Sequence, residues 1–216
     1  MTAVPSARPT EAFGRDRLLL AGGVLAGPIF VGSALVQSFT RDGFDFRRHA
    51  VSVLSTGELG WIQILTFLVT GLLTIGAART LPRLSAGGPV WIPRLLTLYG
   101  VGLAGAGIFS ADPGDGFPAG TPRGSGQISW HGGLHFLAAA VAFVSLIVAT
   151  VLLARRSARS GDRLDAAAHL IVGTYFGVAW LAMIVAPGQV TMVGFGLAVA
   201  VGWAWVTVVL ARVGRS

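Results

Sequence analysis

The chain has 216 residues, of which 53% are hydrophobic and only 12% are charged, and its net charge is +7 at pH 7. Soluble domains carry about 25% charged residues, so this composition excludes an ordinary soluble domain. The chain has no cysteine, which excludes disulfides, thiolate metal sites and cysteine nucleophiles. A basic chain can bind nucleic acid, but these arginines flank apolar stretches, where positive charge orients membrane proteins. We therefore expect no nucleic-acid partner.

Six long stretches contain no Asp, Glu, Arg, Lys or His. They cover residues 18–39, 62–78, 95–111, 136–154, 170–186 and 190–211. A helix needs about 20 mostly apolar residues to cross the hydrocarbon core of a bilayer. The sequence therefore predicts an all-α, polytopic membrane protein with six transmembrane helices, at 17–39, 59–80, 91–111, 129–154, 166–186 and 189–211. Residues 1–16 are expected to be a disordered N-terminal tail, 17–212 the transmembrane domain and 213–216 a C-terminal tail.

The positions of the arginines predict the orientation of these helices. All 16 basic residues are arginine, and only Arg41, Arg47, Arg48 and Arg123 fall in the first and third connections. The others lie at the termini and in the second and fourth connections. Because positively charged loops stay inside the cell, we expect three outward-pointing helical hairpins with both termini cytoplasmic. The expected location is the cell membrane, with multiple passes.

The loop at 40–58 holds a first cluster of polar side chains. Asp45, Arg48, His49 and Ser52 follow one another at i, i+3, i+4 and i+7, a spacing that places them on one side of a helix. A short helix over 45–54, lying at the membrane interface, would present them together. The alternative is that Asp45 simply pairs with Arg48 or His49 on a solvated face.

A second cluster lies between the third and fourth predicted helices. Asp112 ends an apolar stretch, where a carboxylate is costly unless it has a partner, and Asp115 is read as a turn residue. Ser129 is a plausible N-cap. His131 and His135 share one helical face, which suits two imidazole ligands for one metal. With Asp112 or His49 as a third ligand they could hold zinc and leave a position open for water. A hydrogen-bonded histidine pair without metal, or a proton-transfer role, are the alternatives.

These motifs resemble a known family of prokaryotic membrane proteins. The resemblance rests on Asp45, Arg48-His49, Ser52-x-Leu54-Ser55, Gly60-Trp61-x-Gln63, Asp112-Pro113, Gly116-x-Pro118 and the helix of His135. The family is the domain of unknown function nine-nine-eight, and the likeness covers about residues 17–212. It implies a polytopic helical fold and no established activity, so it assigns no role to any residue.

Three functions remain open. The first is an accessory membrane protein, which either binds a membrane lipid or isoprenoid through a polar cluster at the outer face or merely closes that face of the bundle with the same cluster. The second is an enzyme, either a metal-dependent hydrolase or an acid-initiated isoprenoid cyclase, that uses the same cluster. The third is a small transporter subunit, which is disfavoured because the predicted helices carry no ionisable residue at mid-membrane. The candidate catalytic residues are Asp45, His49, Asp112, His131 and His135. The candidate ligand-binding residues are Arg48, Ser52, Trp61, Gln63 and Trp130, with Arg48 holding an anionic head group.

Overall fold

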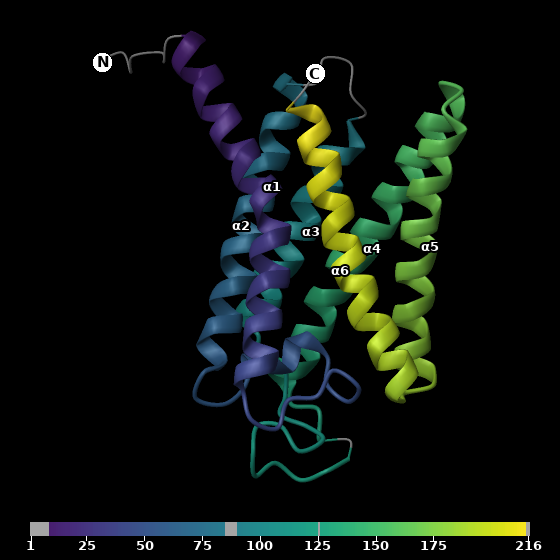
Figure 1. Ribbon diagram of the computed structural model, residues 1–216. Coiled ribbons are helices and arrows are strands. Elements are labelled where there is room, and N and C mark those ends of the chain that lie inside the picture. Colours follow the sequence, from purple (N-terminus) through teal and green to yellow (C-terminus); the bar gives the residue numbers. More distant parts are fainter. Residues whose placement is uncertain (1–8, 85–89, 125, 215–216) are drawn as a thin grey trace.

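The computed structural model describes residues 9–84, 90–124 and 126–214. This part of the chain forms six long helices and one short 3-10 helix, η1 (Val51–Ser55) (Figure 1). The long helices are α1 (Pro9–Thr40), α2 (Gly60–Leu84), α3 (Trp91–Ile108), α4 (Trp130–Arg159), α5 (Arg163–Val185) and α6 (Gln189–Val213). The predicted number of helices and the all-α class are confirmed.

The helices begin and end at somewhat different residues from those predicted. Two of these differences, at the start of α1 and the end of α3, have identifiable reasons. The first helix begins at Pro9, within the segment predicted as a disordered tail. There Asp16 is buried, and its carboxylate accepts hydrogen bonds of 2.7 and 2.9 Å from Arg83 on α2. The third helix ends at Ile108 because the next residue, Phe109, has an extended backbone. Residues 109–111 therefore belong to the loop.

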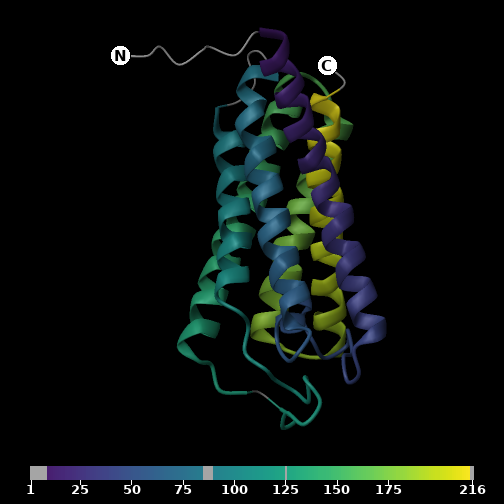
Figure 2. The ribbon, with the colours of Figure 1, turned by 90° about the vertical axis from the view of Figure 1, so that its left-hand side faces the viewer.

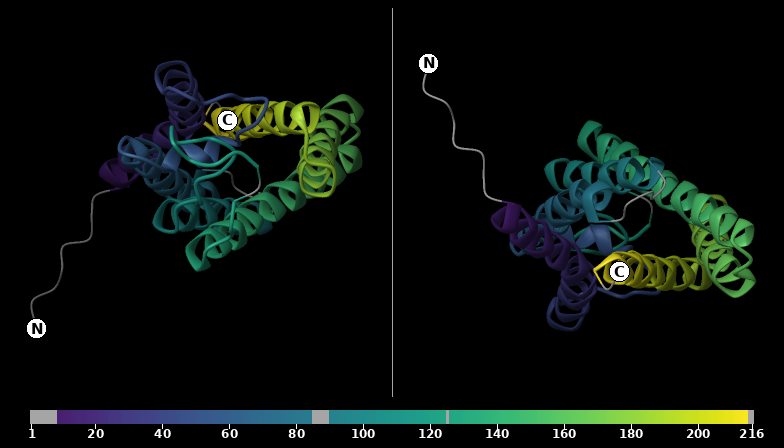
Figure 3. Two further views of the ribbon diagram at one scale, coloured as in Figure 1. Left: turned by 90° about the horizontal axis from the view of Figure 1, so that it is seen from below. Right: turned by 90° about the horizontal axis from the view of Figure 1, so that it is seen from above.

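Each helix packs against its neighbours in the chain, and α6 returns to α1, so the six helices form a closed ring. Figure 3 shows this ring from both ends. The connections alternate between the two ends of the bundle (Figures 1 and 2). We call the end that carries the two long loops, residues 41–59 and 109–129, the loop end. The end at which α1 begins and α6 ends is called the terminal end.

Five helices are long and apolar enough to cross a membrane, namely α1, α2, α4, α5 and α6. They indicate a multi-pass membrane protein. The remaining helix, α3, packs closely between α2 and α4. A Cβ atom at Gly71 would lie 2.7 Å from the carbonyl oxygen of Gly100, and one at Gly102 would lie 2.5 Å from that of Ala138. Small residues at such crossings let membrane helices approach closely, so α3 is held by its neighbours.

Part of the interior of the ring is filled by the side chains of one apolar core. Trp203, Leu146, Val206 and Leu210, which belong to it, are at most 1% exposed. At Gly27, α1 meets α6 closely, and a Cβ there would lie 2.4 Å from Oγ1 of Thr207.

A partly buried polar network joins α4, α5 and α6 at the terminal end. The indole N–H of Trp205 donates to Nδ1 of His169 at 2.8 Å, and Nε2 of His169 lies 3.1 Å from Oδ2 of Asp165. Asp165 also accepts from Ser157 on α4 and Arg212 on α6. Because Nδ1 is an acceptor here, Nε2 carries the ring proton and donates it to the carboxylate. The network therefore connects three helices through one histidine of fixed tautomer.

Candidate functional site

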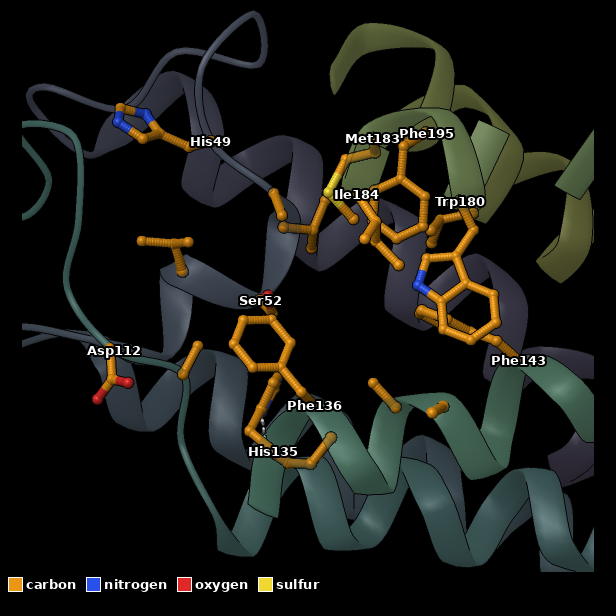
Figure 4. A pocket seen from close by; sticks show the side chains of 18 of the residues that line it. His49, Ser52, Asp112, His135, Phe136, Phe143, Trp180, Met183, Ile184 and Phe195 are labelled. Carbon is orange, nitrogen blue, oxygen red and sulfur yellow. Dashed lines mark hydrogen bonds between the residues drawn. The ribbon is translucent and has the colours of Figure 1, made fainter. Parts of the chain in front are cut away.

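A cavity of about 770 Å³ opens inside the loop half of the ring. Side chains of all six long helices and of both long loops line it. Its body is largely apolar and includes Phe30, Phe143 and Phe195, with the hydroxyl of Tyr99 on α3 among them. Most of its polar side chains come from the loops and the start of α4. Figure 4 shows Asp112 and His49 on one side of the cavity and Trp180 and Phe195 on the other. The volume is typical of a site for a small molecule, about 300–1,000 Å³.

The two long loops are tied together by an ion pair. Arg48 donates from Nε to Oδ2 of Asp115 at 3.0 Å, and a second nitrogen lies 3.0 Å from Oδ1. The guanidinium also donates to the backbone carbonyl of Asp115. Arg48, and after it the N–H of Gly124, lowers the pKa of Asp115 to about 2. Arg48 thus has a carboxylate of the protein itself as its partner.

The expected short helix over 45–54 does not form. Asp45 begins a tight turn, in which its carbonyl accepts from the N–H groups of Arg48 and His49, and η1 follows only at Val51. The carboxylate of Asp45 pairs with Arg47, at 3.0 and 3.1 Å, which keeps the pKa of Asp45 below its ordinary value. The expected common helical face is wrong because local backbone and side-chain hydrogen bonds compete with helix formation in this loop.

His49 is buried and joins the same two loops. Its Nδ1 accepts from the backbone N–H of Asp45 at 3.0 Å, and its Nε2 lies 3.1 Å from the carbonyl oxygen of Asp115. An Nδ1 that accepts carries no proton, so the neutral ring donates from Nε2. Both nitrogens are therefore engaged. In this arrangement His49 positions Asp115 and has no free nitrogen for acid–base chemistry.

Arg41 and Phe117 also build this loop contact, and sequence reasoning did not single them out. The guanidinium of Arg41 donates to the carbonyls of Leu54 and Thr56, each at 2.5 Å. Its Cζ lies 4.8 Å from the centroid of Phe117, a ring that is only 1% exposed. A lone aromatic residue in a Gly- and Pro-rich loop was the available signal, since such a residue seldom lies in a loop without a packing partner.

Asp112 finds its partner in the cap of α4. Its carboxylate accepts from the N–H of Ser129 at 2.8 Å and from the Ser129 hydroxyl at 2.5 Å. The same hydroxyl accepts from the N–H of Gly132, so Ser129 is the N-cap. A carboxylate at this position also complements the positive end of the helix dipole. The Ser129 hydroxyl lies 3.2 Å from Nδ1 of His131, whose side chain is exposed and does not line the cavity.

His135 lines the cavity at the first turns of α4 and is only 2% exposed. Its Nδ1 lies 3.0 Å from the carbonyl oxygen of Ala106 and 2.8 Å from that of Phe109, at the end of α3. The ring also meets Phe67 and Phe136 edge to face. His131 and His135 therefore lie in different surroundings, although they are only one helical turn apart.

The expected zinc ligands do not form a metal site in this arrangement. Asp112 is bound by Ser129, and His135 is turned with Nδ1 to α3. Within the described ranges, no three His, Asp or Glu side chains gather closely enough to hold a metal ion. The donor set that zinc would need is thus not assembled here.

Three of the candidate ligand-binding residues lie away from the cavity. Trp61 and Trp130 stand at the loop ends of their helices and are 59% and 70% exposed, as interfacial aromatic residues are. Gln63 is buried between α1 and α2, where its Oε1 accepts from Nε2 of Gln37 at 2.8 Å. By contrast, Arg48 and Ser52 border the cavity.

A second, smaller groove of about 270 Å³ lies between the loop halves of α1 and α6. Figure 1 shows α6 leaning away from α1 toward the loop end. The groove shares Phe30, His49, Val51 and Val199 with the cavity. Since one set of side chains borders both spaces, the groove at this seam adjoins the cavity.

Comparison with known proteins yields one match. Residues 24–212 match the family model of proteins of unknown function called DUF998. The chain belongs to this family. The expected resemblance is thereby confirmed over nearly the whole bundle, although DUF998 carries no assigned activity. No curated protein and no solved structure matches the chain.

Proposed function

We propose that the chain binds a membrane lipid or isoprenoid in the cavity at its loop end. The single observation that supports this function is an apolar space of about 770 Å³ with polar groups at one side, inside a bundle of membrane-type helices. An amphiphile has the matching shape, a chain for the aromatic body and a small head for the loops. Its natural source is the bilayer that surrounds the helices.

The distribution of arginine supports an orientation for this site. Most arginines lie at the terminal end, which we assign to the cytoplasm by the positive-inside rule. The three hairpins then point outward, and the cavity lies in the outer half of the cell membrane. Because the chain has no cysteine, single cysteines report this directly. An impermeant maleimide on intact cells should label Ala119→Cys and should label Ser160→Cys only after permeabilisation. The reverse pattern would overturn the orientation.

An enzyme that uses the same cluster has less support. Acid–base work needs a group that can exchange a proton with the ligand, but Asp112 is bound by Ser129 and His49 by backbone groups of both loops. His135 is the one candidate catalytic residue that borders the cavity with a nitrogen unoccupied by any described residue. Lipid binding requires no such group.

The test is to fill the cavity and measure the lipid that the protein retains. Ala140 lines the cavity, whereas Ala204 is exposed on α6 and does not. After mild detergent extraction, quantitative mass spectrometry should find a defined lipid at near-stoichiometric amounts in the wild type and in Ala204→Trp. Ala140→Trp should retain much less of it. Equal amounts in all three proteins, or no specific lipid in the wild type, would overturn the proposal.

A further inference from the structure

The protonation pattern of His135 is set by α3. Both groups that face Nδ1, the carbonyl oxygens of Ala106 and Phe109, can only accept hydrogen bonds. Nδ1 must therefore carry a proton and donate. These carbonyls belong to the end of α3, where carbonyl groups lack partners within the helix, so the histidine satisfies groups that the helix leaves open.

The other ring nitrogen, Nε2, is consequently a hydrogen-bond acceptor. The ring is buried, borders Phe67 and Phe136, and has no carboxylate within hydrogen-bonding distance in the described part of the chain. Such surroundings favour the neutral imidazole. No described residue donates to Nε2, and the residue lines the cavity. Nε2 is not among the described side-chain atoms that are buried without a partner, so it is reachable from the cavity, where the O–H group of a ligand can donate to it.

The charges around the cavity disfavour an anionic ligand. The described charged residues that line it are Arg48, Asp112 and Asp115, one cation and two carboxylates. The cation is already paired in bidentate fashion with Asp115. A phosphate or carboxylate head would have to break this pair and lie near Asp112. The expectation that Arg48 holds an anionic head group therefore finds no support in the geometry.

We infer that the ligand is an amphiphile with an uncharged head that donates an O–H hydrogen bond to Nε2 of His135. This inference rests on the proposed lipid-binding function and names the head group. The hydroxyl of Ser52 also lines the cavity (Figure 4), and no described residue hydrogen-bonds to it. It can bond the lone pairs of the same head. A long-chain alcohol, such as an isoprenoid alcohol, has this chemistry.

The experiment compares three probes that share one apolar chain. Geranylgeraniol has the O–H donor, its methyl ether lacks the donor, and geranylgeranyl diphosphate replaces it with charge. Each is titrated into purified protein in nanodiscs, and tryptophan fluorescence reports binding because Trp180 and Trp203 line the cavity. We expect the alcohol to bind roughly tenfold more tightly than the ether, as the net contribution of one hydrogen bond implies. The diphosphate should bind more weakly still.

Two variants assign the preference to one residue. His135→Phe removes the acceptor and should reduce the alcohol-to-ether preference to near one. His131→Phe, on the exposed residue one turn away, should leave the preference unchanged. If His135→Phe does not fold, the comparison of the three probes on the wild type still tests whether the head group is an uncharged hydrogen-bond donor.

The outcomes distinguish a failure of the proposed lipid binding from a failure of the inferred head group. If none of the three probes binds, the proposed lipid-binding function itself fails. If the ether binds as well as the alcohol, or the diphosphate binds most tightly, lipid binding stands and the inferred head group is wrong. A tenfold preference that persists in His135→Phe would likewise remove His135 from the site.

Discussion

Gly132 occupies a position that has no room for a side chain. A Cβ atom there would lie 1.9 Å from Oδ2 of Asp112, whereas one at the neighbouring Gly133 would meet no described atom within 4 Å. The close approach lets the carboxylate of Asp112 reach the cap of α4. The absence of a side chain at Gly132 thus allows the loop at residues 109–129 to contact α4.

We predict that Gly132→Ala destabilises the protein while Gly133→Ala does not. The added methyl group must displace Asp112, which should lower the free energy of unfolding by about 1–3 kcal/mol. Alanine at position 133 should be neutral or slightly stabilising, since alanine favours helix more than glycine does. Thermal unfolding in one detergent measures both. Equal midpoints for the two variants would contradict the role of Gly132.

The ion pair between Asp115 and Arg48 leads us to predict that the protein loses stability in acid. The pKa of Asp115 is about 2 in the folded protein, below the ordinary 3.8, chiefly because Arg48 donates to it. A carboxyl group with a depressed pKa stabilises the fold above its unfolded pKa, and this contribution disappears as the pH falls through the folded value. We expect the unfolding midpoint to fall between about pH 4 and pH 2. Asp115→Asn should show a smaller fall over this range, and parallel profiles would refute the assignment.

Single residues differ in how far the sequence could predict their surroundings. An isolated carboxylate at the end of an apolar stretch indicated that Asp112 needs a partner, and Ser129 was recognised as a cap. The contact between Asp112 and Ser129 depends on the tertiary structure, because the two residues are 17 positions apart in the sequence. Likewise Arg48 and Asp115 lie 67 residues apart, and only the folded loops bring them together. Local spacing instead suggested Asp45 as the partner of Arg48.

At the scale of the helices, the network around His169 holds α4, α5 and α6 together at the terminal end. His169 stands just before an apolar stretch of the sequence, a position typical of residues at a membrane interface. In the structure it accepts from Trp205 and donates to Asp165. Hydrogen bonds inside a bundle stabilise it most when every member has its partner.

We therefore predict a contrast between two histidines. His169→Ala leaves the buried Trp205 N–H without its acceptor, while Asp165 keeps Ser157 and Arg212 as donors. This loss should lower the free energy of unfolding by about 1–3 kcal/mol. His131→Ala removes an exposed side chain and should change it by less than about 0.5 kcal/mol. Thermal unfolding of both variants in detergent makes the comparison. A similar loss in both would show that the network contributes little.

The number and class of helices follow from the sequence because membrane-spanning segments exclude charge along their length. The ends of the helices are less predictable from the sequence. The ion pair of Asp16 with Arg83 belongs to two helices, and it accompanies a helical segment where a disordered tail was expected. The structure of the long loops is the least predictable from the sequence. Contacts between side chains that are distant in the sequence, such as Arg41 and Phe117, hold these loops in place.

At the scale of the whole molecule, the seam between α1 and α6 predicts a route for the ligand. The two helices are tightly packed at Gly27 and separated by a groove at the loop end. A membrane molecule that enters the cavity from the side would pass this groove. Gly196 lines it, and a Cβ there would meet no described atom within 4 Å.

Gly196→Phe should slow ligand exchange several-fold without loss of stability, because the ring fills the groove. Gly194→Phe is the matched control, since Gly194 has equal room for a Cβ but does not line the groove. The rate at which a fluorescent long-chain alcohol leaves the protein for acceptor vesicles measures the effect. Identical rates for the two variants would exclude this seam as the route.

The lining of the cavity has a consequence for the stability of the whole molecule. Because side chains of all six long helices border it, a lipid that fills the space would contact every helix of the ring. A ligand that binds only the folded state raises its stability. Delipidation of the purified protein should therefore lower its unfolding midpoint, and unchanged midpoints would argue against an occupant of this space.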